Sequence, residues 1–310
     1  MSRRWAAVPI LLALAGTTLV GCRETVEKAS GDDPARRRVR LFWEKLHAAN
    51  EARLRPDCRS AVSLYEQALE VQPGHEDALY YLGQCRRDLG EPRAARAAFD
   101  RLVAANPASA RGHLALGALL ASPDPREPMD PAAAESHLRR AHAINGEETG
   151  PMVRLGELCL VTRRGAEATE WFEHALRTNP KSVEAAFLAG LLAWEDGSKN
   201  VSQLVRRVRE ASEVVAPVKG VLNEGDRRDA KRVAAPPLES PLGKLLFGAP
   251  IAALRGRAAA GKEIDERFVV ALWREARALE AGFVAPATES TRAASQSGAG
   301  RIVGRGGERP

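Results

Sequence analysis

The stretch Glu76–Ser109, EDALYYLGQCRRDLGEPRAARAAFDRLVAANPAS, has the clearest organisation in this chain. Apolar residues recur at three and four positions on either side of Gly90, which predicts two short amphipathic helices joined by a tight turn. Gly83 and Ala95 are small where two antiparallel helices would cross, so the backbones can approach closely. Pro107 ends the second helix, because it lacks the amide hydrogen that continuation requires. A unit of this size cannot bury its own apolar faces and requires copies of itself.

The stretch from Thr149 to Ser182 repeats this pattern at the same length. Gly156 and Ala168 take the positions of the two small residues, Phe172 takes that of the aromatic residue, and Pro180 closes the second helix. A small residue, a second small residue, an aromatic, an alanine and a proline at these offsets resemble the tetratricopeptide repeat. The resemblance implies a solenoid in which each repeat packs against its neighbours.

The predicted fold class is all-α: a solenoid of about four to five helix-turn-helix repeats, then a small helical C-terminal segment and a disordered tail. In the third repeat, the prolines of Ser122–Pro128 exclude a helix and predict a projecting loop. The fifth repeat has Arg206 where an aromatic residue is expected, so we interpret it as a degenerate closing repeat or cap. The repeats are expected near residues 42–75, 76–109, 110–148, 149–182 and 183–216.

The start of the chain has the composition of an export signal. Two arginines precede Trp5–Val20, an apolar run that is too short to span a bilayer comfortably. The run ends in Leu19-Val20-Gly21-Cys22, which resembles the lipobox of bacterial lipoproteins. This resemblance implies that residues 1–21 are a signal peptide and that Cys22 carries the lipid at the mature N-terminus. An ordinary cleaved signal and a retained anchor helix are the alternatives.

Composition also separates the segments outside the solenoid, which is expected to span residues 39–216. Residues 22–38 are polar and charged and predict a flexible tether after the lipidated terminus. Residues 217–240 are rich in charge, glycine and proline and predict a linker. Helical periodicity returns in residues 241–283, whereas residues 284–310 have almost no apolar content and are expected to be disordered.

Neither composition nor motifs indicate catalysis or nucleic-acid binding. The chain has 46 Lys and Arg against 40 Asp and Glu, but the basic residues are interleaved with acidic ones. The sequence contains no nucleophile motif and no metal-ligand spacing, and His113, His137, His142 and His174 are expected not to pair. We therefore predict a protein that is not an enzyme and that uses no cofactor, no metal, no nucleic acid and no small-molecule substrate.

Two cysteines deserve comparison, because export would place the fold where disulfides form. Cys58 lies early in the second helix of the first repeat, and Cys85 lies late in the first helix of the second repeat. These helices are neighbouring and antiparallel, so both residues would lie at a similar height along the helix axes. One interpretation is therefore a disulfide. The other interpretation is favoured: each is a small buried residue like Cys159, because similar height does not guarantee the Cα separation that a disulfide needs.

The resemblance implies that the first helices of the repeats line a concave groove that accepts a peptide or a partner helix. The early half of this groove mixes rings, amides and arginines, whereas the late half is apolar. Either a partner helix or the chain's own Leu242–Gly282 segment must cover the apolar half. The groove is assigned to Trp43, Asn50, Tyr80, Gln84, Arg87, Leu114, Val153, Glu157, Phe187, Leu191 and Trp194, with Arg53, Arg111 and Leu160 as further lining residues.

Together these features predict a non-catalytic scaffold or adaptor that is lipid-anchored in a bacterial cell envelope. Its expected partners are other envelope proteins or peptides, and its expected place is the periplasmic face of the outer or inner membrane if the cell is Gram-negative. The architecture is similar to that of tetratricopeptide lipoproteins that support outer-membrane, secretin or pilus assembly. The alternatives are a non-catalytic subunit that presents substrate to a secreted enzyme, and an enzyme with a site in the C-terminal region.

Overall fold

The computed structural model describes residues 33–124, 126, 128–212, 241–281 and 283. These residues form twelve α-helices and contain no strand, so the predicted all-α class is confirmed. None of the described helices is both long and apolar enough to cross a membrane. The expected signal peptide at 1–21, Cys22, the linker at 217–240 and the tail at 284–310 lie outside the described residues.

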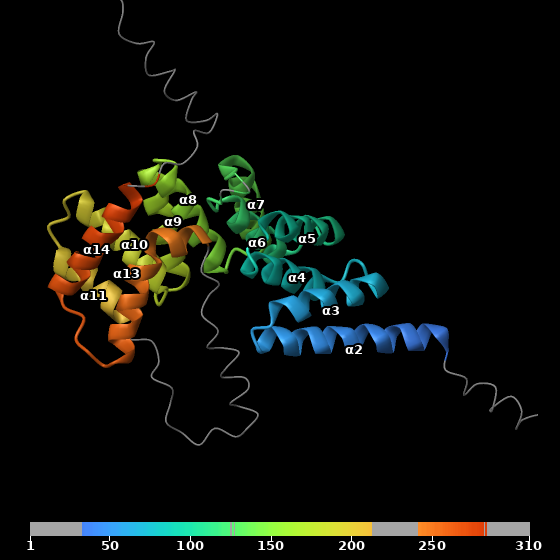
Figure 1. Cartoon of the computed structure of the whole chain (residues 1–310). Helices are drawn as coiled ribbons and strands as arrows, with labels where there is room; N and C mark the ends of the chain where they lie inside the picture. The colour runs from blue at the N-terminus through green and yellow to red at the C-terminus, as the bar shows by residue number, and fades with distance from the viewer. Residues whose placement is uncertain (1–32, 125, 127, 213–240, 282, 284–310) are drawn as a thin grey trace, which may run out of the picture.

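The helices form antiparallel pairs that stack along the chain (Figure 1). Within each pair the two helices pack together, and the second helix also packs against the first helix of the next pair. The C-terminal helices α13 (Pro241–Ala259) and α14 (Glu266–Ala281) form a further pair beside α10 and α11. The five repeat pairs are α2 (Pro34–Leu54) with α3 (Cys58–Val71), α4 (Glu76–Asp88) with α5 (Pro92–Ala105), α6 (Ala110–Leu120) with α7 (Pro131–Ile144), α8 (Thr149–Val161) with α9 (Gly165–Thr178), and α10 (Val183–Glu195) with α11 (Val201–Ser212).

Short polar caps begin several of these helices, as the sequence pattern requires. The Asp57 carboxylate accepts a hydrogen bond from the Ser60 amide over 3.1 Å, and the Ser109 hydroxyl accepts one from the Gly112 amide over 3.1 Å. Such caps satisfy an amide that would otherwise lack a partner at the helix start. Between α4 and α5, Gly90 has a φ of 73°, which a residue without a Cβ adopts without strain.

A glycine of the first helix meets a ring of the second helix in two of the pairs. A Cβ added to Gly83 would lie 2.4 Å from Cε1 of Phe99, and a Cβ added to Gly156 would lie 2.4 Å from Cε1 of Phe172. Real Cβ atoms do not approach other atoms so closely, so a larger residue would force the two helices apart. The close approach predicted at these glycines is confirmed.

In the fifth pair the ring comes from outside the repeat. Helix α11 has Arg206 at the ring position, and a Cβ added to Gly190 would instead lie 2.6 Å from Cζ2 of Trp273 in α14. The Trp273 side chain is fully buried, and its ring stacks on that of Trp194 with 6.0 Å between centroids. The C-terminal pair therefore completes the fifth repeat.

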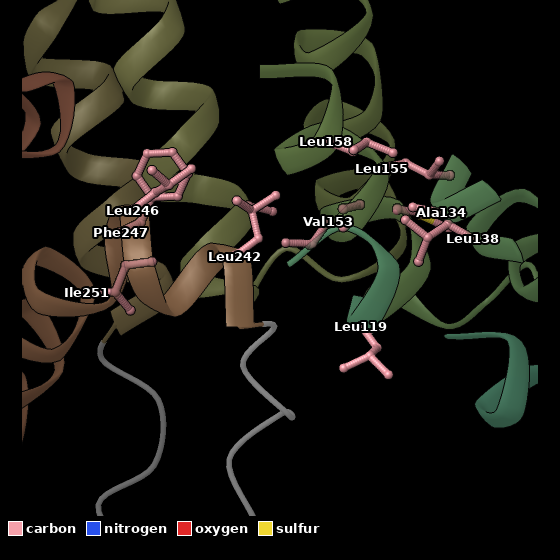
Figure 2. Packing of buried hydrophobic residues seen from close by; sticks show 14 of the residues in the cluster. Leu119, Ala134, Leu138, Val153, Leu155, Leu158, Leu242, Leu246, Phe247 and Ile251 are labelled. Atoms are coloured by element: carbon pink, nitrogen blue, oxygen red, sulfur yellow. The ribbon is translucent and has the colours of Figure 1, made fainter. Parts of the chain in front are cut away.

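One continuous apolar core extends from α2 to α14. Helix α13 contributes to it along its length, since Leu242, Leu246, Phe247 and Ile251 are buried (Figure 2). The same cluster includes Val153 of α8, so the C-terminal segment shares a core with the late repeats rather than forming a separate unit.

The irregular segments differ in outcome. The described residues between Ser122 and Asp130 are not helical, as their prolines predict, and Arg126 donates a hydrogen bond to the carbonyl oxygen of Gly90 in the α4–α5 turn. The tether was expected to extend to Arg38, but α2 begins at Pro34. A helix start at Pro34 is favoured because proline has a φ suited to the first helical turn and needs no amide partner there.

Candidate functional site: the face lined by the first helices

The first helices α2, α4, α6, α8 and α10 present one face, which we call the first-helix face. Helix α13 packs across α6, α8 and α10 on this face, and α14 reaches α10 through Trp273. The face is therefore divided. Its covered half comprises Val153, Glu157, Leu160, Phe187, Leu191 and Trp194, and its open half comprises Trp43, Asn50, Arg53, Tyr80, Gln84, Arg87, Arg111 and Leu114.

The covered half lies inside the protein. Val153, Glu157, Phe187 and Leu191 are all buried, and Trp194 is partly buried against Trp273. Of the two occupants considered for the apolar half, the structure contains the chain's own C-terminal segment. These groove residues would reach a partner only if α13 and α14 left the face.

A buried group of charges lies under α13. Arg154 and Glu157 of α8 form an ion pair of 2.7 Å with side chains only 8% and 3% exposed. Glu184 of α10 pairs with Arg255 of α13. The cavity beside these residues measures about 10 Å³, close to the minimum that one water requires. Helix α13 therefore fits tightly, with opposite charges paired across the interface.

Helix α14 is also held by ion pairs at its C-terminal end. Arg277 pairs with Glu195 of α10 over 2.7 Å, and it pairs with Glu280 of its own helix over 2.7 Å. The buried Glu280 carboxylate lies 3.7 Å from Arg163, which follows α8. These contacts connect α14 to both the fourth and the fifth repeat.

In the open half, α2 presents apolar surface to solvent. Trp43 is 47% exposed, and its ring meets Phe42 edge-on at 5.1 Å and His75 edge-on at 6.1 Å between centroids. Leu54, the last residue of the helix, is 73% exposed. The neighbouring rings hold the indole in place, so Trp43 offers a rigid contact surface.

Beside this surface lies a group of polar side chains. The Tyr65 hydroxyl donates to Oδ1 of Asn50 over 2.7 Å, which leaves the Asn50 amide N–H groups as its donors for another partner. Burial raises the pKa of Tyr65 to about 12, so its hydroxyl keeps its proton at neutral pH. Arg53 lies 4.1 Å above the Tyr81 ring, and its Nε has no hydrogen-bond partner among the described residues.

The remaining polar residues of the open half are largely enclosed. Tyr80 is buried, and the Arg111 guanidinium lies 4.9 Å from its ring centroid while pairing with Glu76 over 3.0 Å. Gln84 is 8% exposed, and its buried Oε1 accepts no hydrogen bond in the part of the chain described. Arg87 pairs with the adjacent Asp88 over 2.9 Å. The accessible surface is therefore set mainly by α2.

The histidines contradict their expected isolation. Nδ1 of His113 in α6 lies 2.9 Å from Nδ1 of His137 in α7, and the rings are 5.2 Å apart between centroids at an angle of 29°. His142 and His174 also meet, with 5.3 Å between centroids. Spacing within one helix carries no signal for such pairs, because their members lie on different helices. Among the described residues, no three histidine, cysteine or acidic side chains are placed to hold a metal.

The three cysteines of the described chain are free thiols. Burial raises the pKa of Cys85 to about 12, and the adjacent Cys58 thiol contributes in the same direction. The two thiols are therefore neighbours, as their expected heights imply. A disulfide between them stays the less favoured of the two interpretations.

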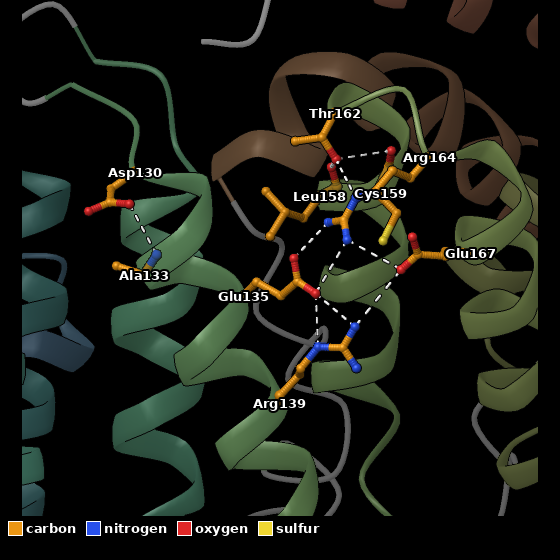
Figure 3. A network of polar contacts seen from close by, with 9 residues as sticks. All are labelled: Asp130, Ala133, Glu135, Arg139, Leu158, Cys159, Thr162, Arg164 and Glu167. Atoms are coloured by element: carbon orange, nitrogen blue, oxygen red, sulfur yellow. Dashed lines mark hydrogen bonds and ion pairs between the residues drawn. The ribbon is translucent and has the colours of Figure 1, made fainter. Parts of the chain in front are cut away.

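An ion-pair network joins the third and fourth repeats (Figure 3). Glu135 of α7 pairs with Arg164 over 2.7 Å and with Arg139 over 2.7 Å, and Arg164 also pairs with Glu167 over 3.2 Å. Burial opposes ionisation of Glu135, but the two arginines outweigh it and lower the pKa of that carboxyl. The network thus ties α7 to the start of α9.

Comparisons with known proteins agree with this architecture. Residues 57–119 match the family model described as tetratricopeptide repeat. A search of curated proteins finds no match. Among solved structures, one described as the functional characterization of Pseudomonas aeruginosa pilF has a TM-score of 0.51 and 19% identity, covering 79% of this chain and 99% of that one.

Two further structures are similar at lower scores. A structure of the MamA protein has a TM-score of 0.48 and 22% identity, covering 59% of this chain and 98% of its own. The structure of YrrB, described as a TPR protein with an unusual peptide-binding site, has a TM-score of 0.44 and 16% identity. The match covers 68% of this chain and 98% of that one. At these identities the likeness concerns the fold alone. The family match covers residues 57–119, and the five stacked helix pairs give the described part of the chain the all-α solenoid fold of tetratricopeptide repeats.

Proposed function

We propose that this chain is a non-catalytic scaffold or adaptor that binds a peptide or protein segment on the open half of the first-helix face. One observation carries the proposal: α13 and α14 cover the late first helices but leave Trp43 half-exposed beside Asn50 and Arg53. Tryptophan and arginine are enriched among residues that dominate protein interfaces. An apolar side chain of the ligand would contact Trp43, and a ligand carbonyl or carboxylate would accept from Asn50.

The proposal also places the protein in a bacterial cell envelope, attached through lipid on Cys22. Its support is the sequence Leu19-Val20-Gly21-Cys22 after an apolar run. The chain from Cys22 to Pro34 spans at most about 40 Å, at roughly 3.5 Å per residue. The repeats would therefore work close to the membrane surface, on partners that are themselves envelope proteins or peptides.

The test is site-specific photo-crosslinking in cells that express the chain. A photoreactive amino acid at Leu54 reports on the open half, because that position is 73% exposed and lies on α2. We expect adducts with a specific partner that disappear in the Trp43→Ala, Asn50→Ala variant. The matched control is Trp171→Ala, Gln67→Ala, which removes the same side-chain types from second helices.

The control should keep the adducts, and thermal unfolding should show that both variants are folded. Adducts that persist in the Trp43→Ala, Asn50→Ala variant would contradict the proposal. Loss of adducts in the control as well would show that the substitutions act through stability and not through the open half.

A further inference from the structure

The first turns of α2 concentrate the positive charge of this protein. The formal net charge of the whole chain is +6. Residues 34–41 alone carry four arginines and no acidic residue, which contributes +4. No separate stretch of eight residues carries four basic residues without an acidic one, so this segment is the densest uncompensated positive charge in the sequence.

This basic segment projects from the fold. Every residue from Pro34 to Leu41 is exposed, whereas Phe42, the next residue, is fully buried. About two helical turns therefore extend beyond the last packed residue of the first repeat. Val39 and Leu41 are 49% and 42% exposed on the same turns. The segment, which we call the basic overhang, adds no core contact that would explain its helical form.

Its charges also oppose its own secondary structure. The Asp33 carboxylate caps α2 by accepting a hydrogen bond from the Ala35 amide over 3.1 Å, but Arg36 and Arg37 follow in the first turns, where the partial positive charge of the helix end disfavours cations. An anionic surface close to the overhang would relieve both the repulsion among the arginines and their unfavourable position. The arrangement is thus matched to a negatively charged partner.

We infer that the basic overhang binds the anionic headgroups of a lipid bilayer. Two features favour lipid over other polyanions. The overhang begins twelve residues after Cys22, the proposed lipid attachment site, so an acyl anchor would hold it within about 40 Å of a membrane. Exposed Val39 and Leu41 among arginines suit an interface where apolar side chains and cationic groups are both accommodated. The inference adds a second membrane contact to the proposed anchor, one that fixes the start of α2 near the bilayer surface.

Vesicle binding tests this inference without the lipid anchor or any protein partner. The chain from residue 22 onward, with Cys22→Ser so that it cannot be acylated, is mixed with vesicles of 30% phosphatidylglycerol in phosphatidylcholine or of phosphatidylcholine alone. We expect binding to the anionic vesicles only, weakening as salt rises from 50 to 300 mM. Each arginine near such a surface contributes about fivefold to binding, so four together contribute at least about a hundredfold.

The decisive variant replaces the overhang arginines: Arg36→Gln, Arg37→Gln, Arg38→Gln, Arg40→Gln. Its matched control removes four exposed arginines elsewhere: Arg59→Gln, Arg140→Gln, Arg177→Gln, Arg274→Gln. Both variants have the same net charge, so net charge alone cannot separate them. We expect the overhang variant to lose the anionic binding and the control to keep it.

Three results would overturn the inference: no binding to anionic vesicles, equal loss in both variants, or equally tight binding to a 20-base-pair DNA duplex. The last result would mark the overhang as a general polyanion site. None of these results bears on the open half of the first-helix face, whose photo-crosslinking test depends on Trp43 and Asn50.

Discussion

The indole nitrogen of Trp273 donates a hydrogen bond to the main-chain carbonyl oxygen of Phe187 over 3.1 Å. The same indole fills the space above Gly190 and stacks on Trp194. One side chain of α14 thus satisfies a carbonyl of α10, replaces the ring that α11 lacks and covers the last groove residue. The C-terminal pair is consequently an integral cap of the solenoid.

Replacing Trp273 with alanine should destabilise the protein strongly. The indole is fully buried, and truncating a buried tryptophan typically costs about 3–5 kcal/mol of unfolding free energy. Trp171→Ala is the control, because that indole is only partly buried on α9. Urea unfolding at equilibrium measures both. A cost at Trp273 no larger than that at Trp171 would show that α14 is not part of the cooperative core.

Replacing Gly156 with alanine should also destabilise the protein, by about 1–3 kcal/mol, because the new methyl group would overlap the Phe172 ring. Gly165→Ala is the matched control, since nothing lies within 4 Å of a Cβ at that position. Its φ is not positive, so alanine there should be neutral or stabilise by up to about 1 kcal/mol. Thermal unfolding distinguishes the two, and equal melting temperatures would refute the predicted close approach.

The His113–His137 pair predicts a loss of stability in mild acid. Burial lowers the pKa of His113, and the nearby Arg140 adds to this effect while the Pro107 carbonyl opposes it. Burial and His113 likewise lower the pKa of His137, with Arg96 adding to the effect and Asp100 opposing it. In the unfolded chain both residues would titrate near their ordinary value of about 6.5.

Because the unfolded state then binds more protons, the stabilisation is present above about pH 6.5 and is lost as the pH falls towards the lowered values. Denaturant unfolding at pH 7.5, 6.5 and 5.5 measures this trend. In a His137→Gln variant the pH dependence should be shallower. If the variant has the same pH dependence as the wild type, protonation of this histidine pair does not contribute to the loss of stability in acid.

The cysteines should differ in reactivity. Burial raises the pKa of Cys85 to about 12 and that of Cys159 to about 11, so little of either thiol is ionised at neutral pH. Cys58 is partly exposed. Iodoacetamide should therefore modify Cys58 first in the native protein and all three residues in urea, as mass spectrometry would show.

Oxidation tests whether Cys58 and Cys85 can reach disulfide geometry. Treatment with diamide, which takes up the two hydrogens, should join Cys58 and Cys85 and lower the mass of the unalkylated protein by two hydrogens. A Cys159→Ser variant should behave in the same way. Intermolecular products alone would show that the two thiols cannot reach disulfide geometry.

The repeat units were predictable because their signals are local. Gly83 and Phe99 lie within one 34-residue unit, and both small residues and rings recur at constant offsets. The residues of the first-helix face were assigned from the same offsets, but burial shows that Tyr80 and Gln84 contribute little surface while Trp43 is 47% exposed. Repeat position assigns a residue to a face, but accessibility depends on the side chains around it.

Other features were not predictable from spacing. Arg206 marked the fifth repeat as degenerate, but the sequence around it does not say that Trp273 would supply the missing ring. The contact between His113 and His137 was not predictable, because no periodicity within one helix relates the two residues. Contacts between distant segments depend on how whole helices pack, and many sequence separations are compatible with one contact.

The sequence by itself determined that this protein is a helical repeat, because periodicity and small residues at constant offsets are properties of short stretches. Only the tertiary structure decided which part of the first-helix face is open. Apolar residues on α8 and α10 would be satisfied equally by a partner helix or by the chain's own segment, since burial of apolar surface is not directional. The ion pair between Arg255 of α13 and Glu184 and the hydrogen bond from Trp273 of α14 to Phe187 are directional, and they hold the chain's own C-terminal helices over this part of the face.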